Sequence, residues 1–285
     1  MSAAAAVARR TGSRISRNLL RKPTFVFGVA FILTLATVAI FADSVAPWAP
    51  DDMIHGRYQP PGREHLFGTD NLGRDIFSRL VYGSRLSLVV GFVAVGIAAT
   101  IGTFLGIVAG FVRGTLDSVI MRVIDVMLAF PDILLALFII TMLGPSLTNV
   151  MIALGIASIP TYARIARGAT LEVSELEFIE ASRALGSRRF VILLRHVLPN
   201  MFQPILVVAT LGIAGAILAA AGLSFIGLGA PPGTPEWGAI LSEARTYMRR
   251  AWWMAAMPGL LITLTVLAIN LVGDAVRDAL DPRLN

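Results

Sequence analysis

Six long runs of apolar residues are the feature that most constrains what this chain can fold into. A helix of about 20 apolar residues crosses the hydrocarbon core of a bilayer. The runs that meet this length are residues 24–42, 86–112, 119–143, 147–163, 205–223 and 255–272. The composition agrees, because 56% of the 285 residues are hydrophobic and only 15% are charged, against about 25% charged in soluble domains. The sequence therefore predicts an all-α polytopic membrane protein with six transmembrane helices.

Basic residues are distributed unevenly around these runs. Of the 24 Lys and Arg residues, 16 lie in the two tails, in the loops that follow the second and fourth runs, and at the start of the third run (Arg122). The other eight share the remaining loops with eight acidic residues. Because Lys and Arg accumulate on the cytoplasmic side of membranes, we expect both termini in the cytoplasm, with the basic excess facing the lipid bilayer rather than nucleic acid. A cleaved signal peptide is the alternative for the first run, which is longer than a usual signal core.

Residues that the chain lacks exclude several kinds of chemistry. It has no Cys, which rules out disulfides, thiolate metal sites and cysteine nucleophiles. The single Lys, Lys22, precedes a proline, so the Gly-Lys-Ser/Thr of a phosphate-binding P-loop is absent. His55 and His65 share one outer loop, but no other residue there has metal-ligand spacing, and we expect both at the surface. We predict a protein that is not an enzyme and binds no metal or cofactor itself.

The polar loop between the fourth and fifth runs, residues 168–203, is the most informative segment. Acidic residues at helical spacing predict a helix over residues 170–182, and Gly186 is typical of a residue that ends a helix. A second apolar stretch follows, and Pro199 closes the unit. Arginines flank that stretch: Arg188, Arg189 and Arg195. The sequence predicts a helix–Gly–helix hairpin that faces the cytoplasm, charged outside and with an apolar seam.

The order Glu180-Ala181-Ser182, then Gly186, then Leu198-Pro199 resembles the Glu-Ala-Ala loop of the permease subunits of ABC importers. Ser182 stands where that family has a second Ala, which keeps the small volume. The resemblance implies that the hairpin contains a coupling helix docked in a groove of a separate ATPase subunit. Glu180, Arg188 and Arg189 would then pair with that partner.

Further segments narrow the resemblance to the C-type permease of dipeptide, oligopeptide and nickel importers. They are residues 65–79, 129–132, 223–229 and 270–283. The resemblance implies a type I, MetI-like permease fold with an extra N-terminal helix. The expected parts are a basic tail (residues 1–23), the first helix and an outer loop (24–85), the permease core (86–276) and a C-terminal tail (277–285).

The same resemblance implies partners in the cytoplasmic membrane of a prokaryote. These are a homologous second permease subunit, two ATPase subunits that bind ATP and Mg, and an extracytoplasmic substrate-binding protein. Short peptides are the expected cargo, with nickel complexes as the alternative. An ion-coupled secondary transporter is a different class, and it would need mid-membrane coupling residues and often an inverted repeat, neither of which is evident.

Two acidic residues interrupt the third run. Asp125 and Asp132 are seven residues apart, hence on one face of the single long helix expected there, and they are candidates for the translocation path. Pro131 predicts a kink in that helix. The simpler interpretation, which we favour, places Asp132 near the inner surface with a backbone or arginine partner.

Small and charged residues elsewhere suggest packing and docking roles. A stripe of glycines at four-residue spacing along the second run predicts close packing against another helix: Gly102, Gly106, Gly110 and Gly114. The resemblance to the permease family implies that the outer segments, residues 58–85 and 224–254, face the substrate-binding protein. Their charged residues, Glu236 and Glu243 among them, would pair with that protein or, equally, with headgroups and solvent.

Overall fold

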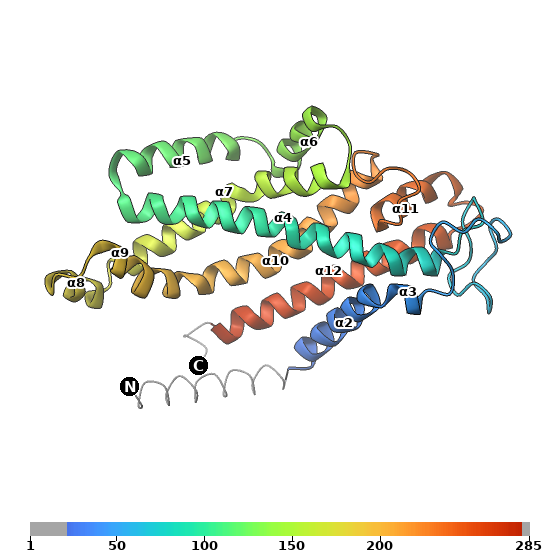
Figure 1. Cartoon of the computed structure of the whole chain (residues 1–285), viewed down its shortest axis with the longest axis horizontal. Coiled ribbons are helices and arrows are strands. Elements are labelled where there is room, and N and C mark those ends of the chain that lie inside the picture. Colours follow the sequence, from blue (N-terminus) through green and yellow to red (C-terminus); the bar gives the residue numbers. More distant parts are fainter. Residues whose placement is uncertain (1–21, 281–285) are drawn as a thin grey trace.

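The computed structural model describes residues 22–280, which form a bundle of long helices (Figure 1). Within that range, five helices are long and apolar enough to cross a membrane, and a bent pair provides a sixth crossing if it is counted as one span. The five are α2 (Pro23–Ile40), α4 (Ile76–Val112), α7 (Leu147–Ser174), α10 (Leu198–Phe225) and α12 (Trp253–Leu280). The predicted all-α membrane fold is confirmed.

Short helices gather at the two ends of the bundle (Figure 1). At one end lie α8 (Glu177–Ala184), α9 (Arg189–Ile192) and a π-helical turn, η1 (Leu193–Val197). At the other end lie α3 (Ala42–Val45), α11 (Trp237–Ala244) and a 3-10 turn, η2 (Arg245–Tyr247). The long helices therefore separate two structurally different surfaces, as expected of a chain that crosses a membrane several times.

The third apolar run is not one long helix, so that prediction was wrong. It forms α5 (Gly114–Leu128) and α6 (Asp132–Leu143), which meet at an angle of 88°. The break falls at Pro131, whose φ of −55° and ψ of 135° are extended rather than helical. A proline has no N–H to donate and disfavours a helical conformation in the residue before it, and both effects end α5 before α6 begins.

The other spanning helices extend beyond their apolar runs. The second run was expected to begin at residue 86, but α4 begins at Ile76, because the Asp75 carboxylate accepts a hydrogen bond from the Ser78 N–H at 2.7 Å and caps the helix. Likewise α7 continues past residue 163 to Ser174 and α10 begins before residue 205. The apolar runs mark the part of each helix that suits the bilayer, not its ends.

Glycines bring α4 against α7. A Cβ on Gly102 would lie 2.6 Å from the carbonyl oxygen of Ile159, and one on Gly110 would lie 2.9 Å from the Cβ of Thr170. A Cβ on Gly106, between them, would overlap the carbonyl oxygen of Ala163. Gly114 does not share this contact: it begins α5 with a φ of +68°, and a Cβ there would meet nothing within 4 Å.

A buried ion network fixes the end of the bundle that carries α11. Asp70 lies 2.6 Å from the Nε of Arg74 and 3.0 Å from an Nη of Arg79. Glu243, on α11, lies 2.7 Å from Arg74 and 2.8 Å from Arg79. Both arginines are at most 2% exposed. The pairing that was considered between Glu243 and another protein is therefore wrong, because its carboxylate is used within the chain.

Two more side chains at this end serve the fold itself. Glu236 caps α11 by accepting hydrogen bonds from the N–H groups of Gly238 and Ala239, both at 2.9 Å. His65 is buried, with its Nδ1 2.9 Å from the Asp75 carboxylate, and its ring stacks edge-on against His55. The expectation of a surface position was wrong for His65, because the loop folds back onto the N-terminus of α4.

Candidate functional site

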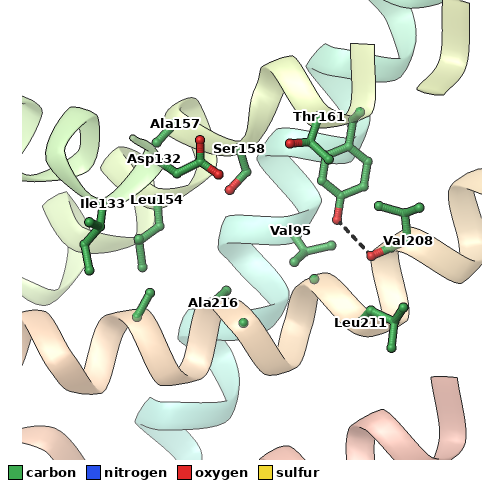
Figure 2. Close-up of a pocket in the computed structure, with 14 residues that line it drawn as sticks. Val95, Asp132, Ile133, Leu154, Ala157, Ser158, Thr161, Val208, Leu211 and Ala216 are labelled. Atoms are coloured by element: carbon green, nitrogen blue, oxygen red, sulfur yellow. Dashed lines mark hydrogen bonds between the residues drawn. The ribbon is translucent and has the colours of Figure 1, made fainter. Parts of the chain in front are cut away.

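A cavity of about 380 Å³ opens between α4, α6, α7 and α10 (Figure 2), and its lining residues lie near the middle of α4, α7 and α10. Its walls are mostly apolar and small. The residues that line it are Val95, Asp132, Ile133, Leu154, Ala157, Ser158, Thr161, Tyr162, Val208, Leu211, Gly212, Gly215, Ala216 and Ala219. A mostly apolar hollow with a few polar groups, of some 300–1,000 Å³, is the usual form of a small-molecule site.

The polar groups of this cavity lie along one side. Figure 2 shows the Asp132 carboxylate directed toward Ser158, with Thr161 one turn further along α7. The Tyr162 hydroxyl donates a long, 3.5 Å hydrogen bond to the Val208 carbonyl oxygen. No Lys, Arg or His is among the described residues that line the cavity. Asp132 therefore sits in the cavity without the arginine or backbone partner that the simpler interpretation assigned to it.

Asp125 lies elsewhere, because the break in the third span separates it from Asp132. The two acids are on different helices, so the expectation that they share one face was wrong. Asp125 pairs with Arg164 of α7 at 2.7 Å, and both side chains are more than half exposed. Asp117 makes a similar contact with Arg167 at 2.6 Å. These pairs hold α5 beside α7 outside the cavity.

The polar loop after α7 forms a helical hairpin of α8 and α9, referred to below as the hairpin. The single helix expected over residues 170–182 was wrong, because α7 ends at Ser174 and α8 begins at Glu177. Gly186 follows α8 with a φ of +79°, which a glycine adopts without strain. The Ser187 N–H donates to the Ser182 carbonyl oxygen at 3.1 Å and closes the turn.

Pro199 does not close the hairpin as expected. It lies in the first turn of α10, and helical structure runs from Arg189 to Phe225. The π-helical turn η1 lies just before this proline, where the regular hydrogen bond to its missing N–H is lost. The Asn200 side chain donates to the His196 carbonyl oxygen at 2.7 Å and satisfies one of the carbonyls on this turn.

Most of the predicted hairpin residues are exposed. Glu180, Ala181, Gly186, Arg188, Arg189, Leu198 and Pro199 are exposed, and Ser182 is half-buried. In the described part of the chain, the side chains of Glu180, Arg188 and Arg189 form no hydrogen bond or ion pair. The side chain that the sequence did not single out is Leu185, which is 87% exposed at the tip of the hairpin. Phe178 and Phe190 of the same hairpin are 46% and 66% exposed, and several large apolar side chains exposed together are typical of a contact surface for another protein.

The inner face of the hairpin is joined to the cavity through one hydrophobic cluster. Ile179 of α8 and Ile192 of α9 are buried in it, together with Met201 of α10. The same cluster includes Val95 and Tyr162, which line the cavity. A displacement of the hairpin would therefore act on the cavity wall through packed side chains.

A basic recess of about 450 Å³ separates the hairpin from the end of α4. Arg113, Arg183 and Arg189 line it, together with Ser187. Arg113 has a φ of 61° and a ψ of −172°, a conformation that residues other than glycine rarely adopt. Its guanidinium lies 3.3 Å from Glu175, and the recess as a whole presents positive charge.

Together, the fold and these two features define a polytopic helical membrane protein with a central cavity and an exposed hairpin at one end. The chain belongs to the family of binding-protein-dependent transport system inner membrane components, whose model matches residues 102–285. The model of the N-terminal transmembrane domain of oligopeptide transport permease C matches residues 12–61, which covers the extra first helix. The chain is thus a transport permease of the C type.

Similar proteins of known name cover nearly the whole chain. A dipeptide transport system permease protein, DppC, of Alkalihalophilus pseudofirmus is 45% identical over 94% of this chain and 88% of its own length. A di/tripeptide permease of Pseudomonas aeruginosa is 46% identical over 90% of this chain and 87% of its own length. A glutathione transport system permease, GsiD, of Escherichia coli is 47% identical over 94% of this chain and 89% of its own length.

Solved structures share the fold at low sequence identity. A chain of the MetNI methionine ABC transporter, in an inward-facing conformation, superposes with a TM-score of 0.61 over 72% of this chain and 98% of its own, at 22% identity. A chain of an amino acid ABC transporter gives a TM-score of 0.56 over 72% of this chain and 95% of its own, at 18% identity. The type I permease fold with an extra first helix is thereby confirmed.

Proposed function

We propose that this permease forms half of the translocation pathway of an ATP-driven importer for short peptides. The observation that carries the proposal is the continuous packing between an exposed hairpin and a central cavity within a permease fold. The names of the similar proteins, which refer to dipeptides, di- and tripeptides and glutathione, support peptides as the cargo.

In this proposal the hairpin receives the motion of a separate ATPase subunit. Leu185 enters an apolar site on that subunit, and Glu180, Arg188 and Arg189, which lack partners within residues 22–280, pair with its charged groups. The single Lys is not in a P-loop, which supports a nucleotide site on the partner rather than on this chain. ATP and Mg would be bound by two such partner subunits.

The hairpin test compares two substitutions at Leu185 in the complete importer. Leu185→Asp should reduce peptide-stimulated ATP hydrolysis and uptake at least about tenfold, because an ion replaces an apolar anchor at the interface. Leu185→Met retains the apolar volume and should retain most of the activity. If Leu185→Asp couples as well as wild type, the hairpin is not the docking element.

The cargo test uses the reconstituted permease pair, ATPases and binding protein in proteoliposomes. We expect uptake of a labelled dipeptide that requires ATP and the binding protein, and no uptake driven by a proton or sodium gradient alone. Uptake of a nickel complex but not of peptides would show that the cargo is a nickel complex, the alternative that the resemblance leaves open. Uptake without ATP, driven by an ion gradient, would place the chain among secondary transporters.

A further inference from the structure

Three polar groups in the cavity have no partner within the chain. The Asp132 carboxylate and the hydroxyls of Ser158 and Thr161 face the cavity, and none forms a hydrogen bond to another residue in the range 22–280. Several threonines in other spans behave differently, although the Thr103 hydroxyl of α4 also lacks a partner among the described residues. Thr34, Thr37 and Thr263 each donate to the carbonyl oxygen four residues earlier at 2.8 Å. The cavity therefore presents polar groups that the fold itself does not use.

Asp132 is open to a bound molecule, because Asp132 and Thr161 are exposed and Ser158 is half-buried. The cavity lies midway along α7 and α10, within the apolar part of both spans. Acidic side chains in membrane-spanning segments are rare, and they almost always face the interior of the bundle or a water-filled cavity. Asp132 is the first residue of α6, where the helix dipole favours a negative charge but does not replace a counter-ion.

We propose that Asp132 binds the α-ammonium group of a peptide as it passes through the cavity. Ser158 and Thr161 then bond to the first peptide carbonyl and amide groups. This inference rests on the proposed function, namely that the cargo is a short peptide.

The chemistry of the cavity matches this end of a peptide rather than the other. One carboxylate balances one ammonium, while the cavity contains no cationic side chain, among the residues described, that would bind the C-terminal carboxylate. The α-ammonium is the cation that unmodified peptides share whatever their side chains. On α10, Ala216 and Gly215, where a Cβ would meet nothing within 4 Å, leave room for side chains of different sizes.

The test compares two cargoes that differ at one group, a dipeptide and its analogue with a hydroxyl in place of the α-ammonium. Binding of each to the isolated substrate-binding protein is measured first, and each is then supplied at saturation, so that delivery is equal. The uptake rates are measured in proteoliposomes containing the complete importer. We expect wild type to prefer the ammonium peptide about tenfold, as a hydrogen-bonded charge contributes, and Asp132→Asn to bring the ratio close to one.

Two variants serve as matched controls. Asp132→Glu retains the charge and should retain the preference. Asp125→Asn removes the neighbouring acid of the same run, which pairs with Arg164 outside the cavity, and should leave the ratio of the two rates unchanged.

The outcomes separate this inference from the proposed function. An unchanged ratio of the two uptake rates in Asp132→Asn overturns the inference. An equal loss of uptake of both cargoes also overturns it, because that result would indicate that Asp132 pairs with a cation of the second permease subunit. If the Asp132→Asn complex does not assemble, the uptake ratio is measured in the double variant Ser158→Ala, Thr161→Val. Loss of the preference for the ammonium peptide in this double variant would assign recognition to the hydroxyls instead of Asp132. A wild-type complex that hydrolyses ATP but imports neither cargo refutes the peptide function itself.

Discussion

Glu243 is a single residue that joins two distant segments of the chain. Its carboxylate contacts Arg74 and Arg79 and also accepts a hydrogen bond from the Gly233 N–H at 2.8 Å. Burial raises the pKa of Glu243, but the hydrogen bond and charge of Arg79, with Gly233 and Arg74, outweigh burial and hold the pKa below its ordinary value. The stabilisation from this pairing is therefore complete above the pKa of the unfolded state, and it is lost as the pH falls through the pKa of the folded state.

Glu243→Gln should consequently lower the stability of the purified complex most at neutral pH. Replacing one partner of a buried ion pair costs about 3–5 kcal/mol, because the remaining charge is left without compensation. The thermal unfolding temperature of wild type and variant in detergent, measured from about pH 7 down to about pH 3.5, should converge toward the acid end. Asp51→Asn, at an exposed carboxylate, is the control. A difference that stays constant with pH would show that the charge of Glu243 contributes nothing.

At the residue scale, the sequence predicts some roles and not others. Gly186 was found because a helix that ends in a left-handed turn requires a glycine. The exposure of Leu185, its neighbour, was missed, because a leucine next to the end of a helix is equally typical of the hydrophobic core. Glu243 was singled out for docking, but its pairing within the chain was missed, because its arginine partners are more than 160 residues away and no local pattern reports such a contact.

At the element scale, the contact between α4 and α7 depends on the absence of side chains at particular positions. A methyl group at Gly106 overlaps the backbone of α7, whereas Gly96 of the same helix has nothing within 4 Å. Gly106→Ala should therefore destabilise the complex by about 1–3 kcal/mol, as overpacking does. Gly96→Ala is the matched control and should be neutral or stabilising by up to about 1 kcal/mol, because alanine is the better helix former.

Thermal unfolding of the two alanine variants in the same detergent measures this difference. Equal unfolding temperatures would mean that α7 moves away from α4 at no cost, and that the glycine stripe does not set their distance. The stripe itself could be predicted from spacing, but its partner helix could not, because small residues at four-residue intervals fit any neighbouring helix.

The bend between α5 and α6 could likewise be predicted only in part from the sequence. Pro131 predicts an interruption, since it removes a donor and restricts Phe130. It does not predict the 88° angle, which also depends on how α6 packs beside α7. That angle is what carries Asp132 into the cavity and leaves Asp125 outside it, so the assignment of the two acids to one surface could not have been corrected from the sequence.

At the scale of the whole molecule, the architecture could be predicted, because hydropathy indicates which segments cross the bilayer and the motifs indicate the family. Long apolar runs are required wherever backbone groups cross hydrocarbon, so five spans and the bent pair were recognisable in advance. The cavity was not, because its walls come from four helices that are distant in sequence and carry the same small apolar residues as the lipid-facing surfaces.

The orientation of the molecule gives a prediction for the complete chain. The basic bias predicts that the hairpin lies in the cytoplasm and the loop around residue 64 outside, and the two lie at opposite ends of the bundle (Figure 1). Because the natural chain contains no Cys, a single cysteine can be introduced without a background signal. A membrane-impermeant maleimide should label Glu64→Cys in spheroplasts and should label Ser187→Cys only after the membrane is opened, since both positions are exposed in the structure. The reverse pattern would invert the orientation, and with it the side from which an ATPase could reach Leu185.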